Sequence, residues 1–326
     1  MSQQQAARAG PPYASVMAGV GGRPTIIPDV PISAVFIAMY LAFAATNMTI
    51  FQINRRRGHK FIPSAVMFGF CMARTTTLVL RIAWANRPQN VSLGIAANIL
   101  VNAGILLIYI LNLIFAQRIL RAKQPSVGWN KILRLTYRAL FVIIFCVLVM
   151  VITTIVLSSY TLNTNTLRIY RDIQLTAITY LLVFTVLPVI IVAIAYILPR
   201  SPAEETFGQG STKTKAIIVL VVSCLCILNA GFKAGTAWSP PRLANNPAWY
   251  HGKAPFYVFN FAVEIVILLI LTSSRIDRRF HIPNGSSQPG DYSSLISKHV
   301  ESSSESAKES GTEKTGGSED TWVNGA

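Results

Sequence analysis

Two residues of opposite charge stand inside long apolar runs of this chain. Glu264 lies midway along the last run, and Arg74 lies in the second. At about 1.5 Å per helical residue, Arg74 is roughly 15 Å below the outer end of its run, and Glu264 is roughly 14 Å below its own. An unpaired ion at that depth in lipid costs at least about 3 kcal/mol. We therefore predict that the two side chains face each other across an outward-opening polar pocket.

Two alternatives to a substrate or ion site at this pair remain open. In the first, the Arg74 and Glu264 side chains only hold helices together, since opposite charges in lipid stabilise the contact between their helices. In the second, the two charges have unrelated placements in the bundle. Depth alone does not separate these interpretations from a functional pocket.

Further polar residues lie in the same half of the apolar runs. We predict four asparagines as pocket-lining or helix-pairing residues: Asn98, Asn102, Asn229 and Asn260. Of these, Asn102 falls in the layer of the charged pair. Arg81 and Lys233 stand within about two turns of the outer end, where a long side chain can reach the lipid headgroups. We predict these two cations as interfacial residues.

The composition is that of a membrane protein. Apolar residues make up 52% of the chain and charged residues only 13%, and the mean hydropathy is +0.46. The net charge of +16 is carried by short basic clusters between apolar runs, so anionic membrane lipid is the predicted counter-charge. A nucleic-acid partner is disfavoured because the basic residues do not gather on one face or tail. A small molecule or lipid is the other predicted ligand class.

Seven apolar runs predict an all-α polytopic membrane protein with seven transmembrane helices. The predicted spans cover about 32–53, 61–84, 91–116, 135–158, 173–198, 215–236 and 255–275. Residues 1–31 are rich in Gln, Ala, Gly and Pro, and predict a disordered tail. Residues 284–326 are rich in Ser, Gly and Glu, and predict a second disordered, acidic tail.

The loop charges predict the orientation of the chain. Lysine and arginine are most frequent in the connections after spans one, three, five and seven. Because such an excess belongs in the cytoplasm, we expect the N-terminus outside or in a lumen and the C-terminus in the cytoplasm. The plasma membrane is the expected location, with other endomembranes as the alternative.

Several kinds of chemistry lack the residues they need. None of the histidines, His59, His251, His281 and His299, lies in an apolar run, so a membrane metal site is not predicted. The last span contains no lysine for a Schiff base, and no phosphate-binding glycine loop with its lysine occurs. The four cysteines lie in apolar runs and are expected to be small core residues. We therefore expect neither an enzyme nor a cofactor.

One segment around the last span is similar to known proteins. The stretch 255–261, then Glu264, and the stretch 275–285 resemble the closing segment of a fungal family of seven-helix integral membrane proteins of uncharacterised function. More distantly, Leu80-Arg81-Ile82 and Tyr257-Val258-Phe259 are similar to the fungal RTA-like proteins. That resemblance implies a lipid-translocating exporter or a stress-response membrane protein. Where those proteins carry an acid after the second motif, this chain has Asn260.

Two function classes follow from these features. The first is a membrane protein that handles lipids or other amphiphiles, with the polar pocket accepting a headgroup. The second is a seven-helix receptor-like sensor, which the basic cytoplasmic loops and the Ser-rich tail favour. Lipid movement across a bilayer is the property that separates the two.

Overall fold

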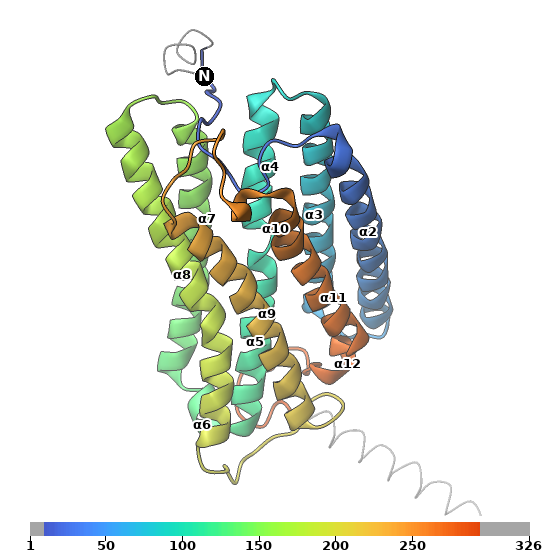
Figure 1. Cartoon of the computed structure of the whole chain (residues 1–326). Coiled ribbons are helices and arrows are strands. Elements are labelled where there is room, and N and C mark those ends of the chain that lie inside the picture. The colour runs from blue at the N-terminus through green and yellow to red at the C-terminus, as the bar shows by residue number, and fades with distance from the viewer. Residues whose placement is uncertain (1–9, 294–326) are drawn as a thin grey trace, which may run out of the picture.

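A computed structural model describes residues 10–293 of the chain, and it is a bundle of long helices (Figure 1). Seven helical spans are long and apolar enough to cross a membrane, which confirms the predicted count and the all-α class. No strand occurs in the described range, where one isolated antiparallel bridge joins Met17 to Leu243. The fold is therefore that of a seven-span integral membrane protein.

The first six spans comprise seven long helices. They are α2 (Ile26–Arg56), α3 (Ile62–Asn86), α4 (Val91–Ala103) with α5 (Leu106–Lys123), α7 (Lys131–Ser158), α8 (Thr164–Ile197) and α9 (Thr212–Trp238). The seventh span joins α10 (Lys253–Tyr257), the π-helical turn η2 (Val258–Ala262) and α11 (Val263–Ser273). Short helices α6 (Pro125–Gly128), η1 (Trp249–His251) and α12 (Ile276–Arg279) lie in the connections.

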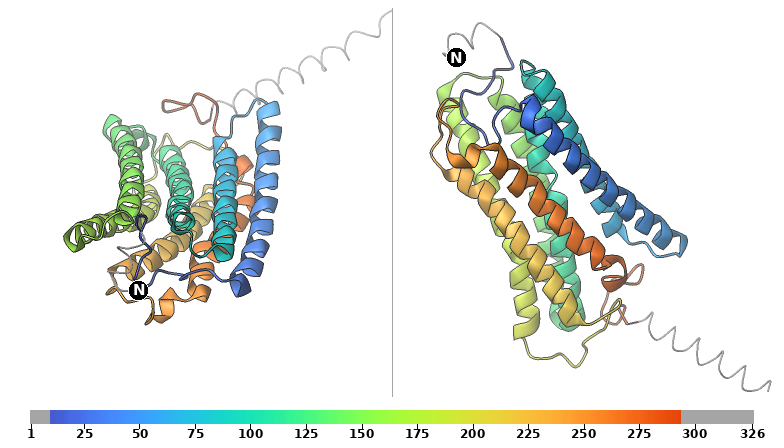
Figure 2. Two further views of the ribbon diagram at one scale, coloured as in Figure 1. Left: turned by 90° about the horizontal axis from the view of Figure 1, so that it is seen from above. Right: turned by 45° about the vertical axis from the view of Figure 1, so that its right-hand side comes forward.

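The spans form a closed ring around α5, which is the second half of the third span. Contacts run from α2 through α3, α4, α7, α8, α9 and α11 back to α2, and α5 also touches α3, α8 and α9. Seen from above, α2, α3, the third span and α7 stand in one row, with the remaining spans in front of it (Figure 2). In the most apolar stretch of the third span, 61% of the residues are buried, whereas the same share in α7 is 11%. The third span is therefore the centre of the bundle.

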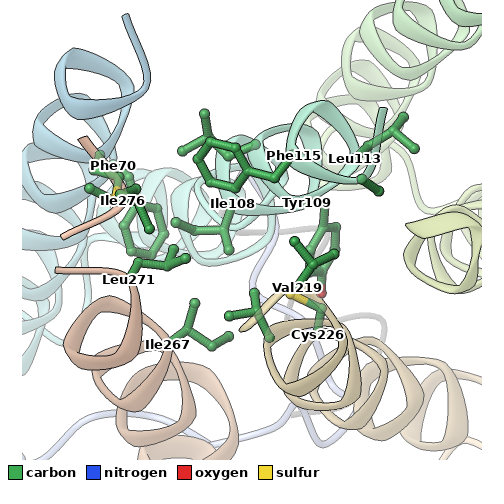
Figure 3. Packing of buried hydrophobic residues seen from close by; sticks show 14 of the residues in the cluster. Phe70, Ile108, Tyr109, Leu113, Phe115, Val219, Cys226, Ile267, Leu271 and Ile276 are labelled. Carbon is green, nitrogen blue, oxygen red and sulfur yellow. The ribbon is translucent and has the colours of Figure 1, made fainter. Parts of the chain in front are cut away.

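Apolar side chains from four spans fill the space around α5. Figure 3 shows Ile108 and Tyr109 of α5 on the side that faces Val219 of α9 and Ile267 of α11. Lipid offers the helices no hydrophobic driving force to associate. Close packing of these side chains therefore holds the helices against one another. Polar contacts inside the bundle then decide the exact registry.

Two groups of connections define the ends of the bundle. The opposite end consists of residues 10–25, 87–90, 159–163 and 239–252. The basic end consists of residues 57–61, 124–130, 198–211 and 274–293 with the adjoining helix ends, which carry Arg55, Arg56, Arg121 and Lys123. Asparagine or serine side chains cap the starts of four helices by accepting backbone N–H bonds: Asn90, Asn130, Asn163 and Ser211. Because of the cap at Asn163, the fifth span begins at Thr164 and not at the predicted residue 173.

Residues 10–31 of the first predicted tail are folded against the bundle or lie in its first helix. Helix α2 spans Ile26–Arg56, but Ile27 has an extended backbone (φ −115°, ψ 125°), so the regular helix begins at Pro28 and not at residue 32. Pro28 and Pro31 then fall in its first turn, where a missing amide hydrogen is tolerated. Residues 10–25 cross the opposite end and bond to its loops, with Ala18 N donating to Arg242 O at 2.8 Å and Gly21 N to His251 O at 3.0 Å. Residues 1–9 lie outside the described range.

The first ten residues of the second predicted tail, 284–293, are in contact with the bundle. Backbone N–H groups of Gly290 and Tyr292 donate to the Glu205 carboxylate at 2.8 and 2.9 Å, and Tyr292 is buried. The segment 284–293 therefore packs onto the basic end. The remainder of this predicted tail, 294–326, lies outside the described residues.

Candidate functional site

Arg74 of α3 and Glu264 of α11 are in direct contact. Arg74 Nε donates to Glu264 Oε2 at 2.6 Å and Nη2 to Oε1 at 2.5 Å, and both side chains are 0% exposed. This two-bond geometry is the strongest arrangement of a guanidinium and a carboxylate. The Tyr40 hydroxyl also donates to Glu264 Oε2, at 3.2 Å. The pair thus joins the first, second and seventh spans.

A break in the third span provides the other partners of Arg74. Its Nη1 donates to the carbonyl oxygens of Leu100 and Val101, each at 3.0 Å, just before α4 ends at Ala103. Gly104 follows, and a Cβ built there would stand 3.1 Å from Arg74 Nη1. A glycine at this position therefore lets the guanidinium approach the helix break.

A second cation reaches the same break. Lys233 Nζ of α9 donates to Val101 O at 3.2 Å, and within the described residues it has no carboxylate partner. The prediction that Lys233 extends to the headgroups is therefore wrong. The freed carbonyl of the third span lies nearer, and it attracts the ammonium group inward. When Lys233 is protonated, two cations and one carboxylate converge on this region.

The seventh span is also irregular beside the pair. A π-helical turn covers Val258–Ala262, immediately before Glu264. Asn229 Nδ2 donates to the Phe259 carbonyl in this turn at 2.6 Å, and its Oδ1 accepts from Tyr109 at 3.0 Å. Single π turns inside α-helices are frequently found at functional sites. The two irregular spans meet at the polar residues.

The four predicted asparagines divide into two groups. Asn229 and Asn260 are buried, and Asn260 Nδ2 bonds to Phe256 O of its own helix at 3.0 Å. Asn98 and Asn102 are exposed, and Asn102 Nδ2 bonds only to the backbone of Asn98. The structure does not bring these two to the charged pair, although Asn102 matches it in depth.

A second buried network was missed by the sequence analysis. Arg81 Nη2 pairs with Asp29 Oδ1 at 2.9 Å, and Lys253 Nζ pairs with Asp29 Oδ2 at 2.6 Å. The Tyr257 hydroxyl donates to Asp29 Oδ1 at 2.8 Å. We call Asp29, Arg81, Lys253 and Tyr257 the Asp29 network. It links the first, second and seventh spans nearer the opposite end.

The sequence predicted Arg81 as an interfacial cation, and this prediction is wrong. Its side chain is buried, its guanidinium lies 4.0 Å from the Phe256 ring centroid, and its Nη2 also donates to Gly21 O at 2.9 Å. The carboxylate that keeps it inside is Asp29, which the prediction assigned to a tail. An acid directly before an apolar run, in the first turn of a helix, was the available signal.

The residues at this site suit ionic recognition better than metal binding. Within residues 10–293, no three His, Cys, Asp or Glu side chains gather to hold a metal ion. Arg74, Lys233 and Glu264 instead place two cations and one carboxylate among apolar walls, and this excess of positive charge favours an anionic partner. No protein-family model, curated protein or solved structure matches this chain. The fold and the site are therefore interpreted from their own chemistry.

Proposed function

We propose that this integral membrane protein handles lipids or other amphiphiles, with the buried polar residues accepting the charged part of the ligand. One observation carries the proposal: Arg74, Lys233 and Glu264 converge on a broken third span inside an apolar bundle. Discontinuous spans near the middle of a membrane protein are typical of substrate sites, because their free backbone groups meet polar ligands there.

The chemistry of the pair suggests how such a ligand would be accepted. A phosphate or carboxylate headgroup has paired acceptor oxygens like those of the Glu264 carboxylate, so it can compete for the Arg74 guanidinium. Lys233 adds a second positive group at Val101, and the glycine and the π turn are places where the two spans can bend. In this proposal the closed pair is the resting arrangement.

A proteoliposome assay tests the proposal. Fluorescent lipid is expected to cross the bilayer faster with the protein than in protein-free vesicles, and Glu264→Gln and Lys233→Met are expected to change that rate. Glu204→Gln is the matched control, because Glu204 pairs with the exposed Arg200 at the basic end. Equal lipid movement with and without protein contradicts the proposal.

The second candidate is a receptor-like sensor. It is supported by the closure of the polar residues, because Arg74 and Glu264 are 0% exposed and residues 10–25 cross the opposite end. A sensor would move no lipid, and ligand would instead change phosphorylation of the Ser-rich segment after residue 293. Ligand-dependent phosphorylation without lipid movement therefore favours this candidate.

A further inference from the structure

A cavity of about 480 Å³ opens at the basic end of the bundle. It is lined by the end of α2, the α8–α9 connection and the residues around α12. Its size falls within the range of about 300–1,000 Å³ that is usual for small-molecule sites. None of the residues of the buried pair or of the Asp29 network lines it, so it is a separate feature.

Positive charge dominates the lining of this cavity. Arg57, Arg275 and Arg278 line it together with a single carboxylate, Asp277. Arg275 binds that carboxylate with hydrogen bonds of 3.1 and 3.2 Å. Within residues 10–293, neither Arg57 nor Arg278 forms an ion pair. Two guanidinium groups at the cavity are thus free to bind an anion.

Two buried polar atoms on the wall also lack partners. Asn54 Nδ2 and His281 Nε2 are inaccessible to solvent and make no hydrogen bond to any described residue. A buried polar atom without a partner costs about 1–3 kcal/mol. The Asn54 amide is a donor, and His281 Nε2 is a donor when it carries its proton. Because both atoms are inaccessible, an anion in the cavity satisfies them only when the Asn54 and His281 side chains turn toward it.

The walls are fixed by backbone contacts between distant segments. Gln209 N donates to Arg278 O at 2.9 Å, and Asn284 Nδ2 donates to Gly58 O at 2.8 Å. Gly208 has a φ of +52°, and a Cβ there would stand 2.2 Å from Arg279 O, so only glycine fits. These contacts hold the α2–α3 and α8–α9 connections against the α12 segment, and the cavity between them is preformed.

We propose that this cavity binds a phosphate-bearing ligand. The planar donors of Arg57 and Arg278 match the oxygens of a phosphate, and His59, whose ring lies 4.5 Å from that of His281, lines the same cavity. The ligand is the headgroup of a membrane lipid or a soluble phosphate, since both present the same oxygens. The proposal is independent of the function proposed for the buried pair.

Binding to purified full-length protein tests this site with two probes. The lipid probe is phosphatidic acid in phosphatidylcholine nanodiscs, with phosphatidylserine as the comparison lipid of like charge sign. The soluble probe is inorganic phosphate, followed by calorimetry. The cavity variant is Arg57→Gln/Arg278→Gln, and the matched control is Arg55→Gln/Arg56→Gln, which changes two exposed arginines that do not line the cavity.

The cavity variant is expected to lose about tenfold or more in affinity, and the control less than about threefold. Both cavity arginines are exposed, so the fold should persist, and circular dichroism checks this. Binding of phosphatidic acid alone assigns a lipid headgroup, and binding of inorganic phosphate assigns a soluble ligand; either supports the site. Equal losses in both variants, or binding of neither probe to the unmodified protein, overturns it.

Discussion

Gly104 lies against the guanidinium of Arg74, so that a Cβ at this glycine would stand 3.1 Å from Nη1 and 3.2 Å from Cζ. The guanidinium cannot retreat freely, because two carbonyls and the Glu264 carboxylate hold it. A methyl group at position 104 must therefore move Arg74 or the helix break. The glycine at position 104 and the Arg74–Glu264 pair therefore depend on each other.

Gly104→Ala is expected to destabilise the protein, although alanine is intrinsically the better helix former by about 1 kcal/mol. The reason is the loss of the Arg74 bonds to Leu100 and Val101. Gly69→Ala in α3 is the matched control, because no atom lies within 4 Å of a Cβ at that site. Apparent melting temperatures in detergent should fall for Gly104→Ala and hold or rise for Gly69→Ala. A rise in both would show that Arg74 has room to adjust.

Removing the charge of Glu264 is expected to cost more than removing both charges of the pair. Glu264→Gln leaves Arg74 buried without a counter-charge, at a cost of about 3–5 kcal/mol. The double variant Arg74→Met/Glu264→Met removes the unpaired charge and should recover part of that loss. Thermal unfolding of the three proteins measures the difference. If Glu264→Gln unfolds like the unmodified protein, the pair does not stabilise the bundle.

The Asp29 network is expected to respond unequally to changes at its two cations. Arg81 is buried, so Arg81→Met leaves Asp29 with Lys253, whereas Lys253→Met removes a side chain that is 29% exposed. A partly exposed ion pair contributes little to stability, whereas removal of one partner from a buried pair costs about 3–5 kcal/mol. Arg81→Met should therefore lower the apparent melting temperature more than Lys253→Met. The reverse order would place the main contact of Asp29 at the surface.

The contribution of His281 to phosphate binding at the basic end is expected to grow as the pH falls from about 7.5 to 6. Burial, and next the neighbouring His59 and Arg118, lower the pKa of His281 below its usual value of 6.5, so the free protein holds it neutral at pH 7. A bound anion favours the charged ring and raises that pKa, and protons are therefore taken up on binding. The other charged groups lining the cavity are Arg57, Arg275, Arg278 and Asp277.

The variant His281→Gln isolates this effect. Inorganic phosphate itself takes up a proton as the pH falls through neutrality, which weakens binding to both proteins equally. The ratio of the two affinities should therefore grow as the pH falls, and calorimetry at several pH values measures it. A ratio that is constant with pH would mean that His281 does not contact the ligand.

Depth along each helix could be predicted from the sequence, and it brought Arg74 and Glu264 to the same layer. A helix rises by a fixed amount per residue, so counting from the end of an apolar run is enough for this. The same count placed Asn102 in that layer, but the residue faces outward. Spans that are apolar on every side do not reveal which face turns inward, and tertiary packing decides it.

The Asp29 network was not predicted because its acid lies before the apolar run, between two prolines. That stretch was interpreted as part of a tail, and Arg81 was then left without a partner and assigned to the headgroups. The cavity at the basic end was also missed. Its walls come from connections far apart in the chain, and their backbone contacts, such as that of Gly208 with Arg279, have no sequence periodicity.

Both ionic clusters join the first two spans to the last one. During synthesis, Arg74 and Asp29 enter the bilayer long before Glu264, Lys253 and Tyr257 are made. A chain that stops after α9 therefore leaves the guanidinium of Arg74 without its carboxylate. The seventh helix supplies that missing charge and completes the polar interior of the bundle.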